Sequence, residues 1–352
     1  MTKTALRNNS PMTSINMQGT DVNMRQRNNY FDFLRAVAII MIIGNHTCSV
    51  ADLSVPRGLG NLAVLQILKS GVPIFLAISG YFLSRISFTD SKSYFQFLYK
   101  HLKHIYIPMI IFSLPFIFGN GLCIRSIIGR FMLTMLGAYS VYYFIFLIAQ
   151  YYILLPFLKR WSRNKRGLTV CGFISAISIT IVTYFHSVLG MDLPLFIYAG
   201  AFPIWIFFFA FGCYLSYNET KGTIFSAFLL VLTLGLSIAE SYWLETYYTA
   251  GTGIKLSVFM LSGVIIYILF SDKFQSKYNQ CHSWMACLFN KIGRLSFTIY
   301  LCHVYVINFL NSQNALTHNW YVNWTIITII SVALVWLIDK ILPKKIGKYI
   351  GL

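Results

Sequence analysis

The stretch FDFLRAVAIIMIIGNHTCSV, residues 31–50, decides the fold class. It is apolar over about the length that an α-helix needs to cross the hydrocarbon of a bilayer. It nevertheless carries Asp32, Arg35 and His46, and ionisable side chains are costly in that environment. The stretch therefore predicts a membrane-spanning helix whose charged positions serve a function.

The rest of the chain is similarly apolar. Of its 352 residues, 57% are hydrophobic and 11% charged, with a mean hydropathy of +0.64, whereas soluble domains carry about 25% charged residues. We therefore predict an all-α, polytopic transmembrane helical bundle, with a further interfacial helix at 122–138. The expected spans number about ten and lie near residues 33–51, 68–85, 102–119, 139–158, 167–185, 198–217, 223–240, 254–270, 295–311 and 321–339.

The distribution of basic residues predicts the orientation. The net charge is +18, and 22 of the 28 lysines and arginines fall in 1–32, 85–103, 159–166, 218–222, 271–294 and 340–352. These segments share one side of the bilayer in the predicted topology, so the positive-inside rule places both termini in the cytoplasm. The basic excess is then a topology signal and a contact for anionic lipid headgroups, and it does not indicate nucleic-acid binding.

This topology divides the chain into three parts. Residues 1–29 are polar and rich in Asn, Ser and Thr, which predicts a disordered cytoplasmic tail. Residues 30–340 form the transmembrane domain, and 341–352 form a basic cytoplasmic tail. The cysteines are scattered along the chain and predict no metal site.

Helix geometry relates the ionisable residues of the first span. Each residue turns about 100° and rises about 1.5 Å, so Arg35 and His46 share one face about 16 Å apart. Asp32 lies three residues before Arg35, where it can pair with the guanidinium and lower the cost of burying it. Simpler interpretations remain open, because Arg35 can snorkel to the interface and His46 can hydrogen-bond a neighbouring helix.

Three further motifs place polar groups at span ends. GVPIFLAISGYFLSR, residues 71–85, contains Ser79, Gly80 and Tyr81, and the glycine permits close backbone approach. KHLKHIYIP, residues 100–108, groups two lysines with two histidines, and GRLSFTIYLCH, residues 293–303, ends on a second histidine. Helix packing and positive-inside flanking would also account for these residues.

In order and spacing these motifs resemble the acyltransferase 3 family of integral membrane O-acyltransferases. The family pattern is Arg, ten residues, then His, followed by Ser-Gly-Tyr, a basic pair before Ile and Pro, and a late Ser-x-x-x-Tyr-Leu-x-His. The chain matches it from about 29 to 340, with Arg35–His46, Ser79–Tyr81 and Ser296–His303. It departs at the third span, where Lys100 and Lys103, or His101 and His104, replace the usual Arg-x-x-Arg. Lysines would bind phosphates as point charges, and histidines would bind them in a pH-dependent way.

The resemblance implies transfer of an acyl group, with acetyl expected, from cytoplasmic acyl-CoA to a hydroxyl of an envelope glycan or lipid-linked saccharide. Acyl-CoA is then a substrate, no cofactor stays bound, and the protein sits in the bacterial cytoplasmic (inner) membrane. The implied donor-binding residues are Arg35, Lys100 and Lys103, because cations attract the phosphates of CoA.

The resemblance also implies roles near the acceptor. His46 either deprotonates the acceptor hydroxyl, which we prefer, or carries the acyl group covalently. The expected supporting residues are Asp32, Ser79, Tyr81, Tyr300 and His303. The alternative is a transporter of an anion or a lipid-linked sugar without bond chemistry, but the sequence has no pair of Gly/Pro-broken spans at matching positions in its two halves.

Overall fold

The computed structural model describes residues 28–50, 58–119, 124–138, 140–218, 220, 223–245, 254–280 and 283–352. Within these ranges every regular element is a helix, which confirms the all-α prediction. Apart from residues 28 and 29, the predicted tail 1–29 lies outside them. The α-helices are α1 (Asn29–Val50), α2 (Leu59–Leu68), α3 (Gly71–Leu83), α4 (Ser91–Gly119), α5 (Ile124–Met135), α6 (Tyr143–Trp161), α7 (Lys165–Thr183), α8 (Leu195–Tyr198), α9 (Phe202–Leu215), α10 (Ile224–Glu245), α11 (Leu256–Leu269), α12 (Asp272–Asn279), α13 (Trp284–Ser312), α14 (Trp320–Ile341) and α15 (Lys344–Gly347).

The spans agree in number with the sequence prediction. Within the described ranges, 9 helical segments are long and apolar enough to cross a membrane, and the bent pair α11–α12 raises the total to as many as 10. The second span is broken, because α2 and α3 together form one candidate span from Leu59 to Leu83, which begins earlier than the predicted residue 68. The helix expected at 122–138 is α5.

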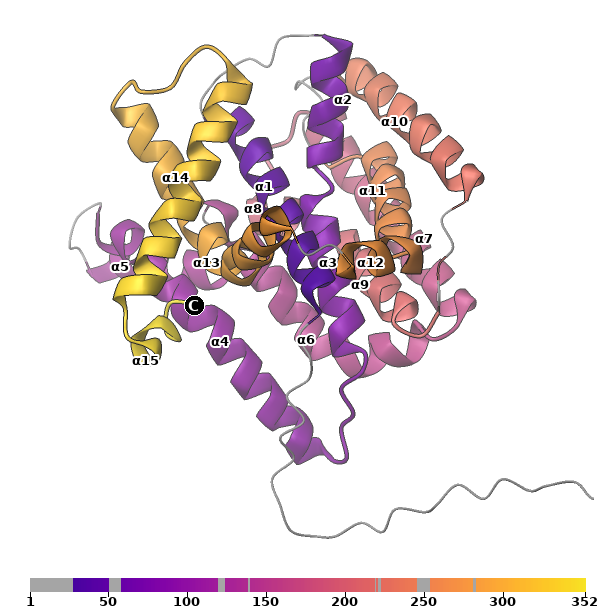
Figure 1. Ribbon diagram of the computed structural model, residues 1–352, viewed down its shortest axis with the longest axis horizontal. Helices are drawn as coiled ribbons and strands as arrows, with labels where there is room; N and C mark the ends of the chain where they lie inside the picture. Colours follow the sequence, from indigo (N-terminus) through magenta and orange to yellow (C-terminus); the bar gives the residue numbers. More distant parts are fainter. Residues whose placement is uncertain are drawn as a thin grey trace, which may run out of the picture.

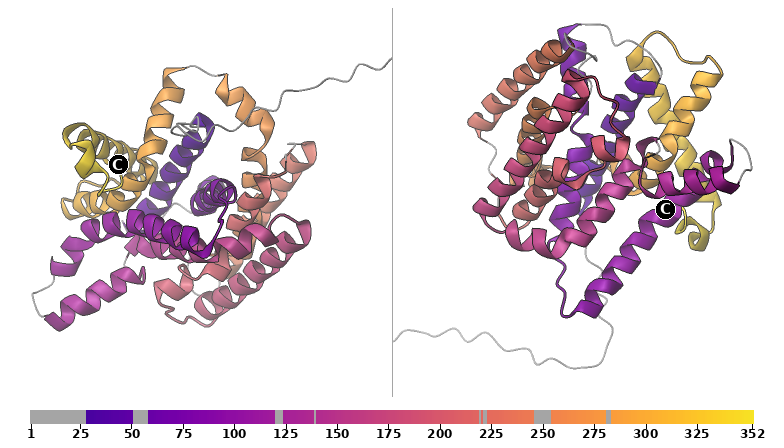
Figure 2. Two further views of the ribbon diagram at one scale, coloured as in Figure 1. Left: turned by 90° about the horizontal axis from the view of Figure 1, so that it is seen from below. Right: turned by 180° about the vertical axis from the view of Figure 1, so that it is seen from behind.

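Helices α1 and α3 lie at the centre of the bundle, as the ribbon and the view from below show (Figures 1 and 2). Helix α1 packs most extensively against α13, and α3 against α9. In the apolar windows of α1 and α13, 61% and 67% of the residues are buried, against 22% for both α10 and α14. The peripheral helices thus present apolar side chains to lipid, while the central ones hold the polar positions.

Glycines allow these central contacts. A Cβ at Gly80 would lie 2.1 Å from the carbonyl oxygen of Phe209, and one at Gly212 would lie 2.0 Å from that of Ala77, so the predicted close approach at Gly80 is confirmed. Helices α1 and α13 meet equally closely, because a Cβ at Gly293 would lie 1.8 Å from the carbonyl oxygen of Asp32. Both helix pairs therefore require a residue without a side chain at the crossing point.

The C-terminal segment folds back onto α13. The Thr298 hydroxyl donates a hydrogen bond to the carbonyl oxygen of Ile350 at 3.1 Å. Gly351 has a φ of +86°, and a Cβ there would lie 2.6 Å from the Phe297 ring. The predicted basic tail 341–352 is thus anchored beside the bundle, and it brings its lysines to the same end of the molecule as Asp32.

Candidate functional site

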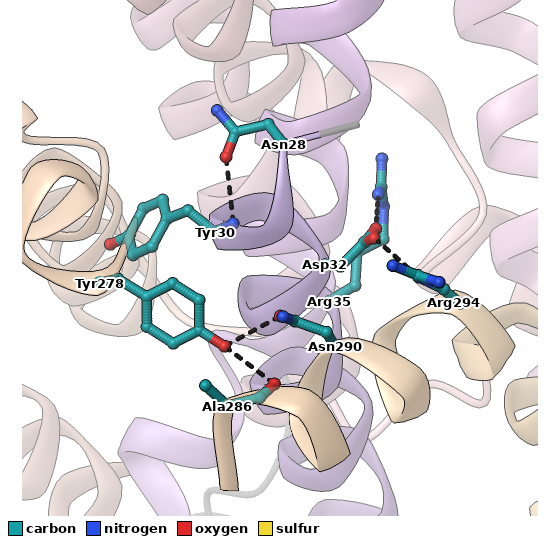
Figure 3. Close-up of polar contacts among 8 residues, drawn as sticks. All are labelled: Asn28, Tyr30, Asp32, Arg35, Tyr278, Ala286, Asn290 and Arg294. Atoms are coloured by element: carbon teal, nitrogen blue, oxygen red, sulfur yellow. Dashed lines mark hydrogen bonds and ion pairs between the residues drawn. The ribbon is translucent and has the colours of Figure 1, made fainter. Parts of the chain in front are cut away.

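A buried carboxylate organises the beginning of α1. Asp32 is fully buried, and its Oδ1 accepts a hydrogen bond from Nη1 of Arg35 at 2.7 Å. Its Oδ2 lies 3.5 Å from Nε of Arg294 on α13, so the carboxylate sits between two guanidinium groups from two helices (Figure 3). The spacing of the sequence predicts the contact with Arg35, while the contact with Arg294 is new.

Aromatic side chains hold this end of α1 in place. The Tyr30 hydroxyl donates to the carbonyl oxygen of Leu269 at 2.5 Å, which ties α1 to the end of α11. The Tyr278 hydroxyl donates to Oδ1 of Asn290 at 2.9 Å (Figure 3), and the Tyr30 and Tyr278 rings lie 5.6 Å apart. The beginning of α1, on which Asp32 lies, is therefore held by contacts with α11 and α12.

Beside Asp32 lies a cavity of about 590 Å³, which we call the Arg35 cavity. Arg35 and Arg294 line it together with His104 of α4, Ser79 of α3 and Tyr300 of α13. The Ser79 hydroxyl donates to the carbonyl oxygen of Phe75 one turn earlier, at 2.9 Å. Two guanidinium groups, an imidazole and four hydroxyls lie in a lining that is otherwise largely apolar and aromatic, and the two guanidinium groups suit an anionic ligand.

The other residues of the basic motif on α4 lie apart from this cavity. Lys100 and Lys103 are exposed, and Nζ of Lys103 lies 5.8 Å from the centre of the Tyr99 ring. Nδ1 of His101 lies 2.8 Å from the carbonyl oxygen of Phe97. Of the four basic side chains, only His104 is among the residues that line the Arg35 cavity within the described part of the chain.

Tyr81 has a packing role in the structure. Its hydroxyl accepts a hydrogen bond from Nη2 of Arg85 at 2.9 Å, and its ring lies 4.6 Å from that of Phe31. It does not line either cavity described here. Its support of the site is therefore indirect, through the position of α1.

A second cavity, of about 320 Å³, contains His46 and is called the His46 cavity. Its polar lining comes from Asn45 beside the histidine, Lys69 at the break between α2 and α3, and Lys255 just before α11. Its remaining wall is largely apolar and aromatic: Ile42, Leu68, Val72, Pro73, Tyr143, Ile179, Leu195, Tyr198, Ala199, Trp205, Phe208, Ile254, Val258, Phe259 and Ser262.

The two histidines of the sequence motifs meet beside this cavity. The rings of His46 and His303 lie 5.4 Å apart. His303 is fully buried, and its Nδ1 lies 2.7 Å from the carbonyl oxygen of Tyr300. Because a carbonyl can only accept, Nδ1 carries the proton, and in the neutral ring Nε2 is then an acceptor. Within the described residues this buried Nε2 has no hydrogen-bond partner.

The two cavities follow one another along three helices. Helix α1 gives Arg35 to one and His46 to the other, while α3 gives Phe75 to the first and Pro73 to the second. On α6 the adjacent residues Tyr143 and Phe144 face the two cavities in the same way.

Aromatic rings lie where the cavities approach each other. The Phe144 ring is 6.2 Å from that of Phe75 and 5.6 Å from that of Tyr300. The Tyr300 hydroxyl donates to the carbonyl oxygen of Val141, which fixes this layer. This aromatic layer lies beside the histidine pair, because the rings of Tyr300 and His303 are 5.8 Å apart.

Sequence reasoning missed three cations of the site. Arg294 was counted as flanking charge, although it lies inside the GRLSF motif. Lys69 lies near the start of the second predicted span and Lys255 within the eighth, and both fall outside the basic segments that predict the orientation. The signal was present, because a lysine within or beside an apolar run is itself an indication of a functional site. Among the described residues, no three His, Cys, Asp or Glu side chains are grouped so as to hold a metal ion.

The fold and the site define a polytopic helical membrane protein with two cavities and a pair of adjacent histidines, of which His46 lines the second cavity. The model of the acyltransferase 3 family, described as an acyltransferase domain, matches residues 28–340. The chain therefore belongs to this family.

Two relatives come from Staphylococcus aureus, strains MSSA476 and MW2, and each is named "Probable poly-beta-1,6-N-acetyl-D-glucosamine export protein". Each is 26% identical over 299 residues, which cover 79% of this chain and 82% of the relative. No solved structure matches the chain significantly.

Proposed function

We propose that this membrane acyltransferase moves an acyl group, acetyl in the first instance, from acyl-CoA to a hydroxyl of an envelope glycan or a lipid-linked saccharide. The observation that carries the proposal is the contact of His46 with His303, 5.4 Å between ring centres, where the Arg35 and His46 cavities approach each other. A transfer enzyme needs a base at the meeting point of two substrates, and this pair provides it.

The Arg35 cavity is the proposed donor site. Its arginines can bind the phosphates or the thioester end of CoA, and Asp32 keeps both guanidinium groups in place. Lys100 and Lys103 are exposed on the same helix as His104, where they would attract the nucleotide phosphates over a longer range. This assignment places the donor at the end of the bundle that carries the basic segments.

The His46 cavity is the proposed acceptor site. A neutral His46 would take the proton of the acceptor hydroxyl while its oxygen attacks the thioester carbonyl. The carbon–sulfur bond then breaks, and the CoA thiolate leaves. Nε2 of His303 is oriented by the Nδ1 contact with the Tyr300 carbonyl, and it can accept a proton from His46 or hold its ring in position. An acyl-imidazole on His46, formed first and then attacked by the acceptor, uses the same geometry.

The proposed setting is the bacterial cytoplasmic membrane, with both termini in the cytoplasm. This orientation follows from the positive-inside distribution of lysine and arginine. It puts Arg35 near the cytoplasmic face, where acyl-CoA is made, and His46 toward the other face, where an envelope glycan is reached.

The test uses membranes that contain wild-type protein, His46→Ala, Arg35→Ala or His318→Ala, each supplied with acetyl-labelled acetyl-CoA. Label in the glycan or lipid fraction is measured together with release of free CoA thiol. We expect transfer with wild type and with the exposed-histidine control His318→Ala, and loss of both signals in the other two. Transfer by His46→Ala at the wild-type rate would reject the proposed base.

A second candidate function is glycan export, because both relatives carry that name. An exporter would move the saccharide across the membrane without consuming acyl-CoA. The two cavities would then be two positions of one substrate path. Movement of labelled saccharide into vesicles without any CoA release, at equal rates with and without acyl-CoA, would favour export over acyl transfer.

A further inference from the structure

A polar groove of about 690 Å³ lies along the first turns of α13, and we call it the Lys291 groove. Six polar residues line it: Asn29, Ser283, Asn290, Lys291, Arg294 and Asp339. The function proposed above uses Arg294 alone among them. The other polar groups therefore raise the question of which ligand the groove binds.

The groove adjoins the Arg35 cavity. Arg294 lines both. At two further places, neighbouring residues divide between the cavity and the groove, Asn28 with Asn29 and Gly351 with Leu352. Arg294 can therefore contact a ligand in either space, and one ligand that occupied both would pass this guanidinium group.

Arg294 keeps hydrogen-bond donors for such a ligand. Its Nε lies 3.5 Å from Oδ2 of Asp32, and its side chain is half exposed. No hydrogen bond from its two terminal nitrogens is present within the described part of the chain. These nitrogens carry four of the five N–H donors of a guanidinium group, and their geometry matches a phosphate. Asp32 thus orients the group while its outer edge faces the ligand.

Lys291 provides a second cation. Its half-buried side chain places Nζ 4.7 Å from the centre of the Trp336 ring on α14, and Nζ of Lys340 lies 5.0 Å from the same ring. The ring attracts an ammonium group but carries no net charge. Among the described residues Lys291 forms no ion pair. Its charge is therefore held beside the groove and can bind an anion.

The groove also offers groups that a site for phosphate alone would not need. Asp339 presents a carboxylate, and Asn290 accepts from the Tyr278 hydroxyl through Oδ1 and keeps the donors of its amide nitrogen (Figure 3). The nucleotide end of acyl-CoA has matching chemistry, because its phosphates stand beside a ribose hydroxyl and an adenine amino group. The pantetheine arm at the other end is uncharged, which suits the largely apolar and aromatic lining of the Arg35 cavity.

We infer that the Lys291 groove binds the nucleotide end of acyl-CoA, with Arg294 and Lys291 on its phosphates, while the pantetheine arm occupies the Arg35 cavity. The inference rests on the proposed function for the identity of the donor. It gives Lys291 a role in binding and none in the chemical step. In this arrangement Lys100 and Lys103 attract the nucleotide from a distance and do not hold it.

The first test measures binding in the absence of donor and acceptor. Full-length protein in phosphatidylcholine nanodiscs is titrated with radiolabelled adenosine 3′,5′-bisphosphate, which has the nucleotide but no pantetheine arm. Lys291→Met should weaken binding about tenfold, the value of one charge-assisted hydrogen bond. Lys291→Arg keeps the charge and should restore most of the affinity, and Lys165→Met, at an exposed lysine that begins α7, should match wild type. Equal binding by Lys291→Met and wild type would overturn the inference, as would no binding by wild type.

A lipid headgroup is another source of phosphate, and a competition experiment distinguishes the two. Glycerol 3-phosphate has the phosphate of a headgroup without the nucleotide. It should displace the labelled bisphosphate at least about tenfold less effectively than unlabelled bisphosphate does. Equal displacement would assign the groove to headgroups and overturn the nucleotide assignment.

Transfer assays then separate the two ends of the donor. In Lys291→Met the KM for acetyl-CoA should rise about tenfold with kcat unchanged, whereas acetylpantetheine, which lacks the nucleotide, should serve Lys291→Met and wild type equally. An equal loss with both donors would overturn the inference. Nucleotide binding that depends on Lys291, in a protein that releases no CoA thiol, would reject acyl transfer and leave the nucleotide site standing, so the two failures are distinguishable.

Discussion

Gly293→Ala tests the contact on which the whole site depends. The added Cβ would lie 1.8 Å from the carbonyl oxygen of Asp32, where ordinary contact begins at 3.4 Å. The opposing atom is backbone, so relief requires α1 and α13 to separate by about 1.5 Å, and overpacking of this kind costs about 1–3 kcal/mol. The same shift would move His46 relative to His303, and a misplacement near 1 Å can lower a rate about 100-fold.

The matched control is Gly235→Ala in α10, where an added Cβ meets nothing within 4 Å. The helix propensity of alanine should raise stability there by about 0.5–1 kcal/mol. Melting of the detergent-solubilised proteins and transfer of labelled acetyl groups are measured side by side. We expect the Tm of Gly293→Ala to fall by several degrees and transfer to be nearly lost, with Gly235→Ala at or above wild type in both. If Gly293→Ala melts and transfers like Gly235→Ala, the close packing of α1 on α13 is wrong.

Three further outcomes follow from the site. Asp32→Asn should destabilise the protein by about 2 kcal/mol in melting experiments, because Arg35 loses a buried charge-assisted partner and is itself only partly exposed; Asp192→Asn, at an exposed carboxylate, should leave the Tm unchanged. His303→Gln has nearly the side-chain volume of histidine and cannot take up a proton, so labelled transfer should fall about 100-fold with little change in Tm; an unchanged rate would limit His303 to packing. Tyr300→Phe leaves its carbonyl partner at Val141 unpaired, which should cost about 1 kcal/mol, read as a lower Tm.

Helix periodicity and apolar length predict much of this fold. They place about ten spans because a helix in lipid must satisfy its backbone internally over a fixed thickness. They do not predict where a span breaks. Lys69 and Ser70 separate α2 from α3 within one candidate span, and the close contact of Gly80 with Phe209 joins α3 to a helix far away in the sequence.

The candidate site shows the same division between local and long-range information. Asp32 and Arg35 are one helical turn apart, so their contact follows from local geometry. The contacts of Asp32 with Arg294 and of His46 with His303 join α1 to α13. The residue pattern within α1 or within α13 does not predict the register in which the two helices align with each other.

That register shows how the two ends of the site are connected. Asp32 contacts Arg294 near the beginning of both helices, and His46 contacts His303 further along both helices. Helices α1 and α13 therefore run parallel. Helix α14 braces α1 from another side, since the indole nitrogens of Trp320 and Trp324 donate to carbonyl oxygens of α1 at 3.2 and 2.9 Å.

A rigid parallel pair cannot shift at one end alone. Under the proposed function, a phosphate-bearing donor would bind Arg35 and Arg294 and draw their guanidinium groups away from Asp32. Any resulting shift of α13 along α1 would change the position of His303 relative to His46. Under the proposed function, the position of His303 relative to His46 therefore depends on the same α1–α13 register that holds Arg294 beside Asp32. On this reasoning Gly293 matters to catalysis although it touches neither substrate.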